Sequence, residues 1–163
     1  MACTAAGPRP PEIVHLLLLL ALLWLPLPAE ASLLHLAGPV PETLGLQAGQ
    51  LAACATPAHC VREDWPLADP VGALAQLRPV VAALPGTTIE TGSAGSVASP
   101  SPPRYLHATA ESRLFGFIDD LELAADPEHG VLQVRSASRL GDSDLGVNRA
   151  RLEQLRQALG PDA

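Results

Sequence analysis

Hydrophobic and polar residues alternate along four stretches in the second half of the chain. Alternation with a period of two is typical of β-strands that bury one face. The expected strands cover residues 87–91, 104–111, 118–125 and 131–139. The sequence DPEHG at 126–130 predicts a turn that joins the last two strands into a hairpin. When the apolar faces of this hairpin are matched, Leu123 lies opposite Val134, and Glu122 lies opposite Arg135 on the outer face.

Two other stretches carry apolar residues at helical spacing. Asp69 and Pro70 are favourable as the N-cap and first residue of a helix, and Pro79 predicts a kink or a split within it. A second helix is expected over residues 147–159, with a polar residue of the preceding loop as its cap. The order α-β-β-β-β-α predicts an α+β fold: a four-stranded antiparallel sheet with helices packed on one face.

The N-terminal part of the chain has the features of an export signal. Residues 13–27 form an apolar run that is short for a membrane span and ends among prolines. A small-x-small pattern follows, so we expect a signal peptide over residues 1–31, with cleavage between Ala31 and Ser32. The alternative is an uncleaved membrane anchor with the domain outside the cytoplasm. In both cases the expected location is the periplasm, a thylakoid lumen or the extracellular space.

The remainder of the chain predicts one domain, over residues 46–160. A disordered or extended segment at 32–45 precedes it, and a flexible loop at 92–103 (GSAGSVASPSPP) interrupts it. The net charge of −7 disfavours a nucleic-acid partner, because phosphate binding needs a dense basic surface.

Two cysteines, Cys54 and Cys60, remain after removal of the signal peptide. An oxidising compartment favours a disulfide between them. A metal site that adds His59 is disfavoured, because three ligands in so short a loop close poorly around a tetrahedral ion. The sequence LAAC ending at Cys54 matches a lipoprotein box, but it lies too far from the apolar run to act as one.

Several segments resemble one known family. The segments YLHA, SRLFGFIDDLEL and GVLQVRSASRLGDSDLGVNRARLEQLR, with LAACATPAHCV upstream, are similar to the domain of unknown function 1499, which is found in bacteria and in plant chloroplasts. The similarity covers roughly residues 46–159. This chain has Ala58-His59-Cys60 where the family usually has Pro-Asn-Cys. The resemblance implies an exported or organellar setting and a joint role for the motif residues. It implies no activity, since a shared fold does not define a function.

The charged residues of these motifs form the candidate site. The candidate binding residues are Arg113, Asp119, Asp120, Arg135, Ser136, Ser138, Arg139, Asp142, Asp144, Asn148 and Arg149. Arginine side chains beside a helix N-terminus suit an anion. The alternative is an internal lattice in which arginines and aspartates pair with one another. Neighbouring carboxylates in a strand point to opposite faces, so Asp119 and Asp120 are not expected to form a catalytic pair.

No catalytic arrangement is evident in the same region. His107 and Glu111 share one strand face, but such pairs are common on protein surfaces. A calcium loop over residues 142–153 fails because Val147 occupies the position that needs glycine. We therefore assign no catalytic residue, no metal and no cofactor. The expected function is a non-catalytic module that binds an unknown protein partner or a membrane-associated assembly through this Arg/Asp-rich site, at the last strand and the start of the C-terminal helix. The alternative is a small-anion binder, or an enzyme of unknown reaction, at the same arginines.

Overall fold

The computed structural model of the chain describes residues 34–90 and 104–160. The expected signal peptide, the bond between Ala31 and Ser32, and the expected flexible loop at 92–103 lie outside the described residues. Within these two ranges, no helix is both long enough and apolar enough to span a bilayer.

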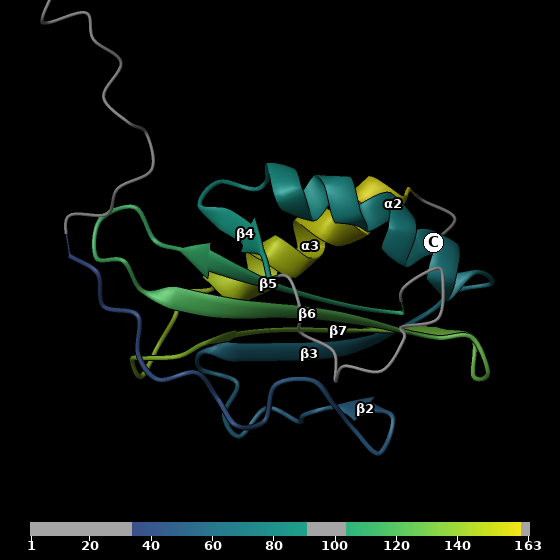
Figure 1. Cartoon of the computed structure of the whole chain (residues 1–163), viewed down its shortest axis with the longest axis horizontal. Helices are drawn as coiled ribbons and strands as arrows, with labels where there is room; N and C mark the ends of the chain where they lie inside the picture. The colour runs from purple at the N-terminus through teal and green to yellow at the C-terminus, as the bar shows by residue number, and fades with distance from the viewer. Residues whose placement is uncertain (1–33, 91–103, 161–163) are drawn as a thin grey trace, which may run out of the picture. The chain divides into compact units, whose positions relative to one another are not determined.

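An antiparallel sheet of five strands forms the centre of the domain (Figure 1). Across the sheet the strands follow the order β3-β7-β6-β5-β4. Their bounds are Cys60–Pro66 (β3), Thr87–Ile89 (β4), Tyr105–Glu111 (β5), Ile118–Asp126 (β6) and Val131–Ser138 (β7). A separate two-stranded sheet pairs β1 (Leu46–Gln47) with β2 (Gln50–Leu51). The α+β class is confirmed, but the central sheet has five strands rather than the four expected.

The additional strand, β3, precedes the first helix and pairs along its whole length with β7. Three consecutive charged residues, Arg62, Glu63 and Asp64, remove the alternation that would have predicted a strand here. Pairing with β7 satisfies the backbone groups along one edge of β3, and burial of Trp65 adds apolar contact. Tertiary packing therefore makes a strand of a segment with a weak local pattern.

The register of the β6–β7 hairpin agrees with the prediction. Leu123 pairs with Val134, Glu122 pairs with Arg135, and Asp119 pairs with Ser138. Because side chains alternate along a strand, this register places Leu121, Leu123, Leu132 and Val134 on one face and most of the charged residues of the hairpin on the other.

Two helices cover one face of the central sheet, which we call the inner face (Figure 1). They are α2 (Pro70–Ala83) and α3 (Val147–Leu159). The Asp69 carboxylate caps α2 by accepting from the Gly72 backbone N–H at 2.8 Å. Pro79 does not split α2; it lies on an exposed side of the continuous helix, where water can solvate the carbonyl left without a donor.

The apolar core lies between the helices and the inner face. Its largest fully buried side chains include Trp65, Leu77, Leu121, Leu132 and Leu155. Burial of each such side chain contributes roughly 1.5–3 kcal/mol relative to exposure.

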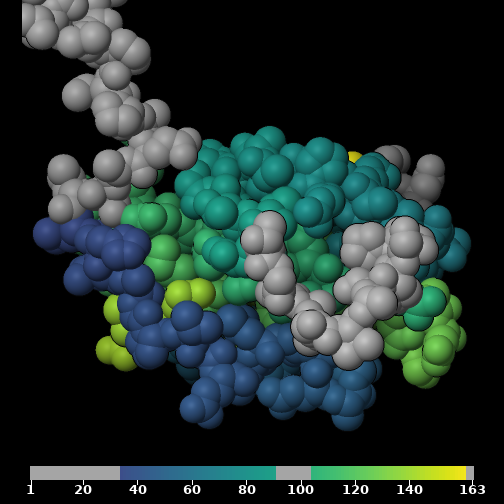
Figure 2. Space-filling view, viewed as in Figure 1, coloured from purple at the N-terminus to yellow at the C-terminus, as the bar shows by residue number. Residues whose placement is uncertain are grey.

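The opposite, outer face is also covered, although its side chains are mostly polar. Residues 34–53, which we call the strap, run along this face and include β1 and β2 (Figures 1 and 2). The Gly45 N–H donates to the Glu122 carboxylate at 2.7 Å, and the Leu51 N–H donates to the Gln133 side chain at 2.9 Å. The part of the expected disordered or extended segment that is described, residues 34–45, is therefore extended and bound to the sheet.

Candidate functional site

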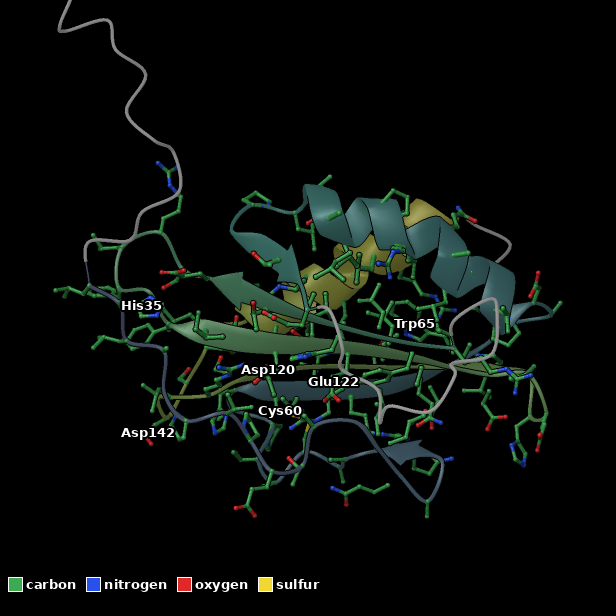
Figure 3. The ribbon with its side chains drawn as sticks, viewed as in Figure 1. His35, Cys60, Trp65, Asp120, Glu122 and Asp142 are labelled. Carbon is green, nitrogen blue, oxygen red and sulfur yellow. A yellow bond between two sulfur atoms is a disulfide. The ribbon has the colours of Figure 1, made fainter. Side chains whose placement is uncertain are left out.

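Asp120 is the centre of a buried charge cluster on the outer face (Figure 3). Its carboxylate accepts two hydrogen bonds from Arg139, at 2.7 and 2.8 Å, and lies 2.8 Å from His107 Nε2. Burial by itself would raise the pKa of Asp120, but the bonds from Arg139 and His107 outweigh burial and hold that pKa below its usual value. The Asp120 hydrogen bond in turn raises the pKa of Arg139. This cluster is an internal ion pair that needs no ligand.

A second outer-face cluster surrounds Glu122, which has no exposed surface. One carboxylate oxygen accepts from the Tyr105 hydroxyl and the Gly45 N–H, both at 2.7 Å. The other oxygen accepts from Arg135 Nη1 at 2.9 Å. Burial and the bond to Glu122 raise the pKa of Tyr105, so this phenol stays protonated at any physiological pH. The carboxylate thereby ties β5, β7 and the strap together.

Asp119 points to the opposite, inner face, as the strand alternation predicts. It accepts from Arg151 Nη2 at 2.8 Å, and Arg151 Nη1 also donates to Ser136 and Asn148 at 2.7 Å. Asn148 donates to the Ser138 hydroxyl at 3.0 Å. This polar network fastens the start of α3 to the β6–β7 hairpin. Asp119 and Asp120 therefore serve two separate networks.

The loop before α3 is ordered by one carboxylate. The N-cap residue of α3 is Gly146 and not Asp144 or Ser143 as expected, but Asp144, two residues earlier, accepts from the Gly146 and Asn148 backbone N–H groups at 2.9 and 3.1 Å. Burial would raise the pKa of Asp144, but these backbone donors lower it. The other three candidates, Arg113, Asp142 and Arg149, are exposed to solvent.

The eleven candidate residues thus do not form one site. The sheet divides the buried ones: Asp120, Arg135 and Arg139 belong to the outer face, and Asp119, Ser136, Ser138 and Asn148 belong to the inner network. Nearly all of them bond to other residues of the domain. This arrangement agrees with the alternative interpretation of an internal lattice.

Sequence reasoning missed Arg151, the residue that completes the inner network. Its position was a usable signal, because Arg151 follows Asn148 by one helical turn and precedes the buried Leu155 by another. His107 was paired by sequence with Glu111, but in the structure it is buried and bonds to Asp120 across the neighbouring strand. Asp120 on the neighbouring strand lies within hydrogen-bond distance of His107, whereas Glu111 is four residues away along the same strand.

The disulfide is present between Cys54 and Cys60, as predicted. It joins the loop after the strap to the first residue of β3. No group of three or more histidine, cysteine or acidic side chains suited to a metal ion occurs in residues 34–90 and 104–160.

Most of the exposed large apolar side chains in the described part of the chain, Leu46 excepted, lie in three segments at one end of the sheet. We call this surface the apolar end, and its residues are Leu34, Leu36, Val40, Leu114, Phe115, Phe117, Leu140, Leu145 and Val147. They come from three segments that touch one another. The Leu36 N–H donates to the Phe115 carbonyl at 3.2 Å, the Phe115 and Phe117 rings are 5.6 Å apart, and the Gly38 backbone packs closely against Leu140. These segments meet at the left of Figure 1.

Comparison with known proteins gives a family and no activity. No curated protein and no solved structure matches the chain. A family model described as a protein of unknown function, DUF1499, matches residues 47–159, which hold the central sheet, both helices and the buried networks. The chain therefore belongs to the DUF1499 family.

Proposed function

We propose that the domain is a non-catalytic binding module that attaches to a protein partner through the apolar end. The observation that carries this proposal is the concentration of exposed apolar side chains: Leu114, Phe115 and Phe117 expose 53%, 45% and 36% of their surface. A contiguous exposed apolar patch on a small domain is characteristic of an interaction surface. The two phenylalanines of the chain both lie there.

The buried networks support a structural rather than a catalytic role for the arginines and aspartates. Asp119, Asp120 and Glu122 each accept a charge-assisted bond from an arginine inside the domain. Such pairing neutralises both groups and keeps a reactive carboxylate from solvent. In this proposal the networks hold the three segments of the apolar end in place, and Arg113 and Asp142 supply exposed charges around it.

The setting of the proposed contact is an exported or membrane-associated assembly. The signal-like N-terminus and the Cys54–Cys60 disulfide support an oxidising compartment outside the cytoplasm. The partner would therefore be another protein of that compartment, with an apolar surface complementary to the loops.

Photo-crosslinking in the cells that naturally produce the protein tests the proposal. Benzoylphenylalanine replaces Phe115 in one variant and Leu46 in another; both side chains expose 45% of their surface, but Leu46 lies on β1, outside the apolar end. We expect a discrete protein adduct from position 115 and none from position 46. Equal adducts from both positions, no adduct from either, or adducts only with lipid would overturn the proposal.

A further inference from the structure

The outer face brings two arginines into direct opposition. Arg62 of β3 and Arg135 of β7 are cross-strand partners, so both side chains rise from the same face of the sheet. Like charges directly opposite each other destabilise a strand pair unless negative groups offset them. The N–H groups of Arg62 are hydrogen-bonded within the protein, whereas one N–H group of Arg135 is not. This difference is the basis for inferring a ligand.

Arg62 is satisfied by the protein. Its Nε donates to the Leu51 carbonyl at 3.2 Å, and its terminal nitrogens donate to Asp64, Gln50 and Gln133 at 3.0–3.2 Å. The Asp64 side chain that pairs with it is 47% exposed, so water screens much of that negative charge.

Arg135 is not satisfied. Its residue is 8% exposed, yet its Nε is a buried donor without a hydrogen-bond partner. Buried guanidinium donors are normally paired, because an unmet donor costs about 1–3 kcal/mol. Glu122 does not supply the missing acceptor: its Oε2 bonds to Arg135 Nη1, its Oε1 bonds to Tyr105 and Gly45, and neither oxygen bonds to Arg135 Nε.

The neighbours of Arg135 on the same face do not supply an acceptor either. Gln133, two residues before it, uses its side-chain oxygen for Leu51 and Arg62 and its nitrogen for the Gly49 carbonyl. Ala137, two residues after it, has only a methyl group, and the carboxylate of its cross-strand partner Asp120 bonds to Arg139 and His107. The Arg135 Nε–H of β7 is therefore a donor without an acceptor, and it lies beside the small side chain of Ala137.

The local charge selects the class of ligand. Among the buried groups of this face, Arg135 is balanced by Glu122 and Arg139 by Asp120. Arg62 adds a positive charge whose own carboxylate partner faces water. The excess on this face is therefore one positive charge, that of Arg62. A ligand with a single negative charge would neutralise this excess, whereas a doubly charged phosphate would leave a net negative charge.

We propose that Arg135 binds the carboxylate group of a small monoanion on the outer face, beside Ala137 and beneath the strap, through its Nε–H. This site is independent of the apolar end. It overlaps the anion site expected from the sequence, which combined Arg113, Arg135 and Arg139 with a helix N-terminus, but it places the ligand on the sheet instead of at the helix. The Arg135 donor lies in the sheet interior, and Arg139 is already committed to Asp120.

The Arg Nε–Hε resonances in ¹⁵N NMR spectra of the whole protein test the proposal directly. We titrate sodium acetate, with sodium chloride and sodium phosphate at matched ionic strength as comparisons. The Arg135 resonance should shift saturably with acetate alone, and the Arg62 resonance should stay in place because its Nε already donates to a carbonyl. The proposal fails if acetate leaves Arg135 unmoved, if chloride reproduces its shift, or if only phosphate moves it.

A pair of variants at position 137 provides a second measurement that leaves Arg135 intact. Ala137→Asp places a carboxylate two residues from Arg135 on the same face, whereas Ala137→Asn has the same shape without the charge. In Ala137→Asp the Arg135 Nε resonance should move in the absence of acetate, and the acetate affinity should fall by at least about tenfold relative to Ala137→Asn. Equal acetate affinities in two folded variants would contradict a carboxylate site at Arg135.

Discussion

Replacement of Asp120 by asparagine should cost a large share of the stability of the domain. Asp120 has no exposed surface and accepts three side-chain hydrogen bonds, from Arg139 and His107. Asp120→Asn keeps the shape but removes the charge, and it turns one acceptor into an amide donor that faces other donors. Breaking a buried ion pair from one side costs about 3–5 kcal/mol, against a total of about 5–15 kcal/mol for a typical domain.

Urea unfolding followed by Trp65 fluorescence measures this loss, because Trp65 is buried in the core. The midpoint should fall while the dependence on urea concentration stays constant, as expected when only stability changes. Asp142→Asn is the matched control, since Asp142 is exposed and should leave the midpoint unchanged. A loss below about 1 kcal/mol in Asp120→Asn would refute the structural role of the pair, because that is the value typical of a surface ion pair.

The remaining predictions concern acid stability, the inner network, the disulfide and one helix. Because the pKa of Asp120 is lower in the folded state than in the unfolded chain, its ionisation stabilises the fold above about pH 4, and this contribution is lost as the pH falls through the folded pKa. Urea midpoints measured between about pH 7 and pH 3 should therefore fall less steeply in Asp120→Asn than in the wild type; parallel curves would contradict this. Arg151→Gln removes the partner of Asp119 and should cost about 2–4 kcal/mol in urea unfolding, whereas Arg149→Gln, an exposed neighbour on α3, should cost much less. A Cys54→Ser/Cys60→Ser double variant should lose about 2 kcal/mol through loop-closure entropy, and full retention of the urea midpoint would count against that account. Pro79→Ala restores a backbone donor on an exposed face of α2 and should raise the thermal midpoint; a fall would show that the proline ring packs usefully.

The family match and the fold leave the activity open, and the buried networks indicate what the motif residues do. Asp119, Asp120 and Glu122 occupy three of four consecutive positions of β6 but bond to different partners on both faces of the sheet. A motif rich in charge therefore serves here to join strands, helix and strap. The binding surfaces that we propose are the apolar end and the site at Arg135.

Local sequence patterns predicted the elements that alternate strongly. The strands around Leu123 and Val134 and the helix that begins at Val147 have a clear period, and their register or start agrees with the structure. The pairing of Glu122 with Arg135 followed from the same register, because the side-chain period in a strand is two and leaves one choice once the apolar face is fixed. Cys54 and Cys60 lie close enough in sequence for pairing to be expected.

Only the tertiary structure determined the remaining features. The segment containing Arg62 and Asp64 becomes a strand because β7 offers an unpaired edge, and no local period reveals that edge. The partners of Asp120 and Asp119 come from β5, from the residue after β7 and from α3, so they depend on which elements pack together rather than on spacing along the chain. The local sequence pattern determines which face of a helix or strand is apolar. Which charged groups meet on the polar face depends on how the elements pack together, and residues far apart in the sequence take part in that packing.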